Sequence, residues 1–156
     1  MSIVVSIDIG YINMGFVEAY ISPSREISII NAKCLNISRH THNRVSKQDC
    51  KLCHTRDIVD GVMHFIQEYK PVLDNCNVLL IERQPPQGFT SIEGILFYEY
   101  RNKAVLISPN AMHSFFNIRH LAYDNRKERT VQFASEYIDL NFIERKHDVS
   151  DAVCMV

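Results

Sequence analysis

The sequence predicts an α/β fold in which a mixed, five-stranded sheet is flanked by helices. Three segments rich in β-branched and alternating apolar residues follow one another at the N-terminus, at residues 2–9, 14–21 and 26–35, which is typical of an antiparallel meander. Two short apolar segments, 78–82 and 104–107, come later and are separated by a helical pattern, as in parallel strands buried on both faces. A meander followed by alternating helices and strands predicts a mixed sheet with helices on its faces.

Helical spacing of apolar residues predicts five helices around this sheet. The first is expected to end before Pro71, and a short one begins with Pro109 in its first turn. The last opens close to Asp148, with Asp148 or a neighbouring residue expected near its N-cap. The five predicted helices cover residues 55–69, 91–101, 109–115, 125–140 and 148–156.

Length and composition are those of one compact domain. The chain has 156 residues, of which 46% are apolar, enough for one core. We therefore expect a single domain over residues 1–156, with a basic loop rich in histidine and cysteine inserted at 36–54. The apolar runs fall far short of the ~20 residues of a membrane-spanning helix, and no secretory signal opens the sequence. The five cysteines do not resemble a disulfide framework, so we expect a soluble intracellular protein.

The basic residues are concentrated in two segments, although the net charge is only −1. Residues 39–56 contain five basic residues against one acid, Asp49, and residues 101–130 contain six against Asp124 and Glu128. Such segments can hold a phosphate backbone, although ordinary solvated loops have the same composition. The basic residues are Arg39, Arg44, Lys47, Lys51 and Arg56, then Arg101, Lys103, Arg119, Arg126, Lys127 and Arg129.

Four acids lie where acids are costly to bury. Asp8 interrupts an apolar strand, and Glu82 ends the apolar run that precedes it. Asp148 and Asp151 open the last helix, and their spacing of three places both on one helical face. Buried carboxylates need partners, and hard oxygen ligands from several elements suit Mg²⁺ or Mn²⁺. Two such ions about 4 Å apart support phosphodiester hydrolysis.

Each acid also has a simpler interpretation. Asp8 can bind local N–H groups at a strand end, and Glu82 can pair with Arg83 or with a distant lysine. Asp148 can act as a helix cap, and Asp151 can favour the helix dipole from the first turn. The metal hypothesis is favoured over these interpretations because all four acids fall at element ends that can converge on one sheet edge.

Five short motifs resemble those of RuvC-type Holliday junction resolvases, most closely the branch found in poxviruses and other large DNA viruses. They run in order from residue 5 to residue 154, so the resemblance covers nearly the whole chain. The first motif alone is weak, whereas all five in order are specific. The motifs are Ser6-Ile7-Asp8-Ile9-Gly10 with Asn13 and Gly15, Leu79-Leu80-Ile81-Glu82-Arg83-Gln84-Pro85, Ile107-Ser108-Pro109, Arg126-Lys127-Glu128-Arg129, and Arg145-Lys146-His147-Asp148-Val149-Ser150-Asp151-Ala152.

The resemblance implies an RNase H-like fold and a homodimeric crossover junction endonuclease. Such an enzyme makes paired symmetric nicks across a four-way DNA junction with Mg²⁺, or with Mn²⁺, during recombination and repair. The viral branch implies action at sites of viral DNA replication in the host cell. The resemblance implies that the family's metal ligands correspond in this sequence to Asp8, Glu82, Asp148 and Asp151.

The same resemblance assigns roles to residues outside the four acids. Lys127 matches a basic helix and is expected to contact the scissile phosphate or attacking water, unless it is an ordinary solvated lysine. Gln84 follows the catalytic glutamate, and is expected either to touch DNA or to orient that glutamate. Arg126 and Arg129 are expected to bind DNA.

A second, zinc-like motif lies in the inserted loop. Cys50 and Cys53 form a Cys-x₂-Cys pair, and His40, His42 and His54 lie nearby. These residue types can make a tetrahedral structural Zn²⁺ site. The alternative is a basic loop with two free thiols.

Two other functions remain open at this stage. One is a nuclease of the same fold that acts on a flap or an RNA–DNA hybrid, which the acid cluster does not distinguish. The other is a non-catalytic module that binds branched DNA, against which the presence of all four acids argues.

Overall fold

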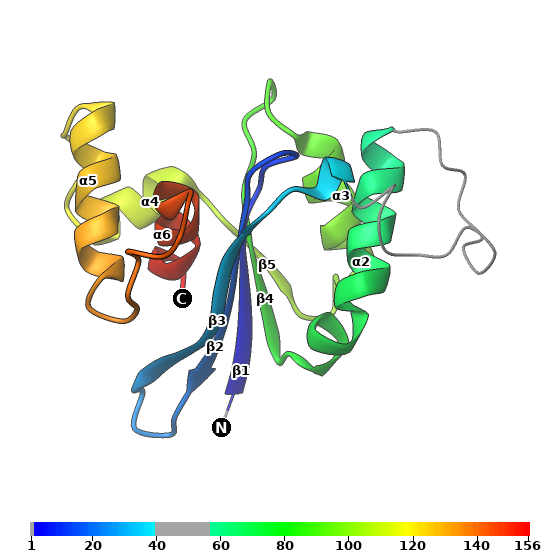
Figure 1. Ribbon diagram of the computed structural model, residues 1–156, viewed down its shortest axis with the longest axis horizontal. Coiled ribbons are helices and arrows are strands. Elements are labelled where there is room, and N and C mark those ends of the chain that lie inside the picture. The colour runs from blue at the N-terminus through cyan, green and yellow to red at the C-terminus, as the bar shows by residue number, and fades with distance from the viewer. Residues whose placement is uncertain (1, 40–56) are drawn as a thin grey trace.

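The computed structural model describes residues 2–39 and 57–156, which build a five-stranded sheet with helices on both faces (Figure 1). The strand order is β3-β2-β1-β4-β5. The first three strands are antiparallel, whereas β4 is parallel to β1 and β5 is parallel to β4. The expected mixed sheet is confirmed. The strands are β1 (Ser2–Asp8), β2 (Met14–Ile21), β3 (Ile27–Leu35), β4 (Val78–Glu82) and β5 (Ala104–Ile107).

Helices α2 and α3 lie on one side of the sheet, and α4, α5 and α6 lie on the other (Figure 1). Helix α6 packs directly against β1, β2 and β3, and α5 packs on α6. No helix in residues 2–39 and 57–156 is long and apolar enough to cross a membrane. The helical segments are η1 (Ile37–Arg39), α2 (Ile58–Asn75), α3 (Thr90–Glu99), α4 (Pro109–Phe115), α5 (Tyr123–Ala134) and α6 (Lys146–Cys154).

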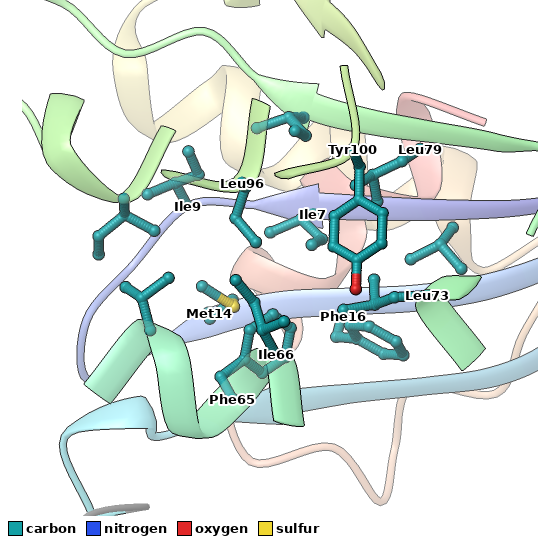
Figure 2. Close-up of a cluster of buried hydrophobic side chains, with 14 of the residues drawn as sticks. Ile7, Ile9, Met14, Phe16, Phe65, Ile66, Leu73, Leu79, Leu96 and Tyr100 are labelled. Atoms are coloured by element: carbon teal, nitrogen blue, oxygen red, sulfur yellow. The ribbon is translucent and has the colours of Figure 1, made fainter. Parts of the chain in front are cut away.

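The larger core lies between the sheet and helices α2 and α3 (Figure 2). Side chains alternate along each strand, so Ile7 of β1 and Phe16 of β2 both face this core and are fully buried. The Phe16 ring meets Phe65 of α2 edge to face, with 6.1 Å between ring centroids. This packing fixes the central strands against α2 and leaves their other face to α6.

The smaller core, between the sheet and α6, is built mostly from small side chains. Val17 and Ala19 of β2 pack with Val149 and Ala152 of α6, and all four are fully buried. Because these side chains are short, the helix axis can approach the sheet closely. This close packing of α6 on the sheet places the start of α6 beside the end of β1.

Helix α2 does not end before Pro71, as the sequence had led us to expect, but continues through it to Asn75. A proline inside a helix removes one backbone hydrogen bond, yet tertiary packing can stabilise the turn that follows. Leu73 in that turn is fully buried in the larger core, and the N–H of Cys76 donates to the carbonyl of Val72. Burial of Leu73 therefore outweighs the local effect of the proline.

The predicted bounds of the last two helices are also corrected. Helix α5 stops at Ala134 rather than reaching residue 140, and the Ser135 hydroxyl donates to the Val131 carbonyl at 2.7 Å in its last turn. Helix α6 already begins at Lys146, with Arg145 as its N-cap. Asp148 is therefore a first-turn residue rather than the cap itself.

Candidate active site

Strand register brings Asp8 and Glu82 together at one edge of the sheet. Ile7 of β1 pairs with Ile81 of β4 in parallel register, and both face the larger core. The next residue on each strand points to the opposite face, which α6 covers. Asp8 and Glu82 therefore end adjacent strands on the same face.

Gly15 allows α6 to reach this edge. Its antiparallel partner on β1 is Asp8. A Cβ atom at Gly15 would collide with the backbone carbonyl oxygen of Asp148 and would lie 3.1 Å from the Cβ of Asp8. The first turn of α6 thus rests on the glycine, and the helix carries Asp148 and Asp151 to the end of β1.

Asp8, Glu82 and Asp151 form one cluster of negative charge. Burial raises the pKa of Asp8 well above its ordinary value, and the charge of Glu82, a hydrogen bond to Glu82 and the charge of Asp151 raise it further. Burial also raises the pKa of Glu82, with a further rise from Asp151, although its hydrogen bonds oppose the shift. Asp8 and Glu82, which resist ionising beside the carboxylate of Asp151, require positive charge nearby.

Lys127 supplies part of that positive charge from α5. Its ammonium group forms an ion pair with Oδ2 of Asp151, and the two side chains are only 23% and 14% exposed. Burial opposes the charge of Lys127, but Asp151 and Asp8 attract it and raise its pKa above the ordinary value. The other oxygen of Asp151, Oδ1, is buried without a hydrogen-bond partner.

The carboxylate of Asp148 is bonded outside this cluster. Its Oδ2 accepts a hydrogen bond from Nε of Arg145 at 3.0 Å. Burial raises the pKa of the Cys34 thiol, and the charge of Asp148 is the next largest cause, which places Asp148 near β3. The structure therefore unites Asp8, Glu82 and Asp151, with Asp148 at the border of the group.

Gln84 is bonded to the protein at both ends of its side chain. Nε2 donates to Oε2 of Glu82 at 2.5 Å, and Oε1 accepts from the N–H of Phe89 at 3.1 Å. The backbone N–H of Gln84 also donates to Glu93 of α3. Of the two roles expected from the sequence, this geometry favours orienting Glu82.

A cavity of about 260 Å³ opens beside the carboxylates. Glu82, Asp151 and Lys127 line it, as does Arg126, whose Nη1 donates to the Leu121 carbonyl at 2.7 Å. Arg129 is instead exposed and bonded to Gln132, so only one of the two arginines expected to bind DNA reaches the cavity.

Two further cavity residues, His113 and Tyr123, were missed by the sequence analysis. His113 comes from α4, and burial together with the charge of Arg126 lowers its pKa. Tyr123 begins α5, and its ring centroid lies 5.8 Å from Nζ of Lys127. The sequence signal for His113 is its position one turn after Pro109, in the helix that follows β5. Ile107, the last residue of β5, pairs with Glu82.

A larger cavity, of about 560 Å³, is also lined by α4 and shares Met112 with the first. Its lining is apolar and aromatic, including Phe116 and Phe133, which stack with 4.8 Å between centroids. None of the described residues that line it has an acidic or basic side chain. The smaller cavity is therefore the one that has the chemistry of a catalytic site.

The donor set at the sheet edge fits a hard divalent cation. Carboxylate oxygens are the ligands that Mg²⁺ prefers, and the buried, unpartnered Oδ1 of Asp151 is a ready donor. As they stand, however, no three histidine, cysteine, aspartate or glutamate side chains in the described ranges are placed to hold a metal ion. Lys127 and Arg145 bind two of the four carboxylates instead.

The candidate zinc ligands lie outside the described residues. His40, His42, Cys50, Cys53 and His54 all fall within positions 40–56. Structural zinc in the inserted loop therefore stays a prediction.

The fold is that of RNase H-like junction resolvases. The structure resembles the fowlpox virus resolvase solved with substrate Holliday junction DNA, with a TM-score of 0.67 and 17% identity over 98% of this chain and 93% of that one. It also resembles the yeast mitochondrial Holliday junction resolvase Ydc2, with a TM-score of 0.64 and 19% identity over 97% of this chain and 76% of that one.

The bacterial branch has the same fold. Thermus thermophilus RuvC matches with a TM-score of 0.60 and 12% identity over 98% of this chain and 90% of that one. By sequence, neither a protein-family model nor a curated protein matches. The RNase H-like fold expected from the motifs is confirmed.

Proposed function

We propose that this chain is a magnesium-dependent endonuclease that resolves four-way DNA junctions by paired symmetric nicks. The observation that carries the proposal is the meeting of Asp8, Glu82 and Asp151, from three different elements, at one edge of an RNase H-like sheet. Residues 1–156 are taken to act as one nuclease domain. Fold likeness to three resolvases supports the choice of substrate.

The divalent ions are assigned to the four acids. Asp8, Glu82 and Asp151 are the inner ligands, and Asp148 joins them from the first turn of α6. Mg²⁺ is the expected ion, and Mn²⁺ has the same ligand preference. When bound, such ions activate a water molecule for attack on the phosphodiester and stabilise the leaving 3′ oxygen.

The remaining cavity residues position the reacting groups. Gln84 fixes one carboxylate oxygen of Glu82 through its amide, so that this ligand is already oriented. Lys127 and Arg126 offer positive charge where a DNA phosphate enters the cavity, and His113 adds a ring N–H donor there. Arg129 is assigned to the DNA backbone outside the cavity. Phosphate contacts of this kind position a strand without reading its sequence.

A homodimer is part of the proposal. A four-way junction has two equivalent strands to cut, and two active sites related by a two-fold axis can meet both. The fowlpox virus and T. thermophilus resolvases have each been solved with junction DNA, which supports branched DNA as the partner.

The test is cleavage of labelled substrates in Mg²⁺. A four-way junction, a linear duplex, a flap and an RNA–DNA hybrid of matched arm sequence are compared at equal concentration. We expect symmetric nicks in two opposite strands of the junction and little cutting of the other three. Ca²⁺, which binds oxygen ligands with a looser geometry, is expected to support binding without cutting.

Each other outcome has a definite meaning. Preferred cutting of the hybrid or the flap would replace the substrate while keeping the acid cluster. Tight junction binding without cutting in Mg²⁺ or Mn²⁺ would instead indicate a non-catalytic branched-DNA-binding module, and the proposal would be wrong.

A further inference from the structure

Two basic side chains hold the carboxylates of α6 in this structure. Lys127 pairs with Asp151, and Arg145 donates to Asp148 at 3.0 Å. Within residues 2–39 and 57–156, no comparable ion pair reaches Asp8 or Glu82. The two acids from the helix are thus neutralised by the protein itself, whereas the two from the strands are not.

The Lys127 pair occupies a position that a metal ion needs. Asp151, Glu82 and Lys127 line the same small cavity, and the charge of Asp151 also acts on Asp8, so its carboxylate lies in the same cluster. A lysine ammonium and a divalent cation repel one another at contact distance, and the repulsion is strong where water is scarce. The ion and Lys127 therefore compete for Asp151.

The side chain of Lys127 can take another position when a metal ion displaces it from Asp151. Its side chain lines the cavity of about 260 Å³ together with Tyr123 and Arg126. The ring of Tyr123 already lies within cation–π range of Nζ, at 5.8 Å from the centroid. Arg145 is 55% exposed, so its guanidinium can move into solvent.

We infer that Lys127 and Arg145 are internal counter-ions that hold Asp151 and Asp148 while no divalent ion is bound and release them when one binds. The inference rests on the proposed function, because it concerns the metal ligands assigned there. It also predicts coupling between metal and DNA. A DNA phosphate in the cavity gives the displaced Lys127 a new partner, so each ligand strengthens binding of the other.

The experiment measures Mn²⁺ affinity without DNA, from the amplitude of the free Mn²⁺ signal in electron paramagnetic resonance. Lys127→Met is expected to bind Mn²⁺ about tenfold more tightly than wild type, equivalent to about 1.4 kcal/mol. Arg145→Gln should show a smaller gain of roughly twofold to fivefold, because its ion pair is more exposed.

Arg129→Met is the matched control. It removes the same charge from the same helix, but among the described residues Arg129 bonds to Gln132 and to none of the four acids. Its Mn²⁺ affinity is expected to stay within about twofold of wild type. A gain limited to Lys127→Met and Arg145→Gln thus separates direct competition from a general change in potential.

The measurement also distinguishes this inference from the proposed function. If wild type binds Mn²⁺ but Lys127→Met binds it equally or more weakly, the counter-ion inference is wrong and the nuclease assignment stands. If folded wild-type protein and folded variants bind no Mn²⁺ at all, both fail. Tighter Mn²⁺ binding by Lys127→Met together with slower junction cleavage is the result expected from both.

Discussion

Asp8 is the most constrained residue of the candidate site, because it is 8% exposed and lies between two other acids. Asp8→Asn keeps the shape of the side chain and removes its negative charge. We expect it to stabilise the metal-free protein by roughly 1–3 kcal/mol, since a poorly compensated buried charge is lost, and to abolish junction cleavage. Chemical denaturation in EDTA measures the first effect, and junction binding in Ca²⁺ should persist. Glu136→Gln, an exposed substitution, is the control and should change neither.

The pH dependence of stability follows from the same shift. The pKa of Asp8 is higher in the folded protein than the ordinary 3.8, so the folded state keeps this proton to higher pH than the unfolded state. Stability of the metal-free protein should therefore fall as pH rises from about 3.8 through the folded pKa. Denaturation midpoints in EDTA across this range test the sign. Asp8→Asn should flatten the decline, and an equally steep decline in that variant would contradict the assignment.

A substitution of Gln84 distinguishes a role in positioning Glu82 from a direct contact with DNA. Gln84→Ala should lower the cleavage rate about 10–100-fold, because Glu82 loses its fixed orientation, with little change in junction affinity. Gln87→Ala, in the same loop and exposed, is the matched control. Rate constants at saturating junction and a separate binding titration are needed. A loss of affinity with an unchanged rate would show that Gln84 contacts DNA instead.

The acids were predictable from the sequence because a carboxylate at the end of an apolar strand is conspicuous. Asp8 and Glu82 were found in this way, Asp151 was found as an acid near the start of an apolar helix, and the structure places the three together. His113 and Tyr123 were not found, since one lies on a short helix and the other at an exposed helix start, where polar residues are ordinary. The ion pair of Lys127 joins residues 24 positions apart and depends on how α5 packs on α6, which no local sequence pattern encodes.

Among the elements, α6 has the most exacting position, and Gly15 controls it. Gly15→Ala should destabilise the fold by about 1–3 kcal/mol, because the new Cβ collides with the Asp148 carbonyl and forces α6 from the sheet. Gly94→Ala is the control. No described residue lies within 4 Å of a Cβ at that helical position, so the substitution should stabilise by about 0.5–1 kcal/mol. Denaturant unfolding of both variants checks the opposite signs, and equal effects would contradict the close approach at Gly15.

Element types were more predictable than element ends. The alternation of the strands and the spacing of the helices follow from local sequence, and the five strands and helices α2 to α6 were all expected. The continuation of α2 past Pro71 depends on Leu73, whose burial in the core is a tertiary effect. Likewise, α6 begins at Lys146, two residues before the predicted start at 148, because Arg145 takes the cap position.

At the scale of the whole molecule, sheet order explains the site. The meander places β1 in the centre with β4 parallel beside it, so two acids at strand ends become neighbours although 74 positions separate them in the sequence (8 to 82). Helix α6 then closes the same edge from the other face (Figure 1). The acids thereby lie on rigid elements, β1, β4 and α6, whereas the other polar residues of the cavity come from α4 and α5.

Paired action of two such centres is the central claim, and a heterodimer of wild-type and Asp8→Asn chains tests it most directly. The substrate is a supercoiled plasmid that extrudes a four-way junction, which becomes linear only when both strands are cut in one binding event. The wild-type homodimer should give linear DNA, the purified heterodimer mainly nicked circles, and the Asp8→Asn homodimer neither. Linear DNA from the heterodimer at the wild-type rate, or cutting by the Asp8→Asn homodimer, would contradict the account.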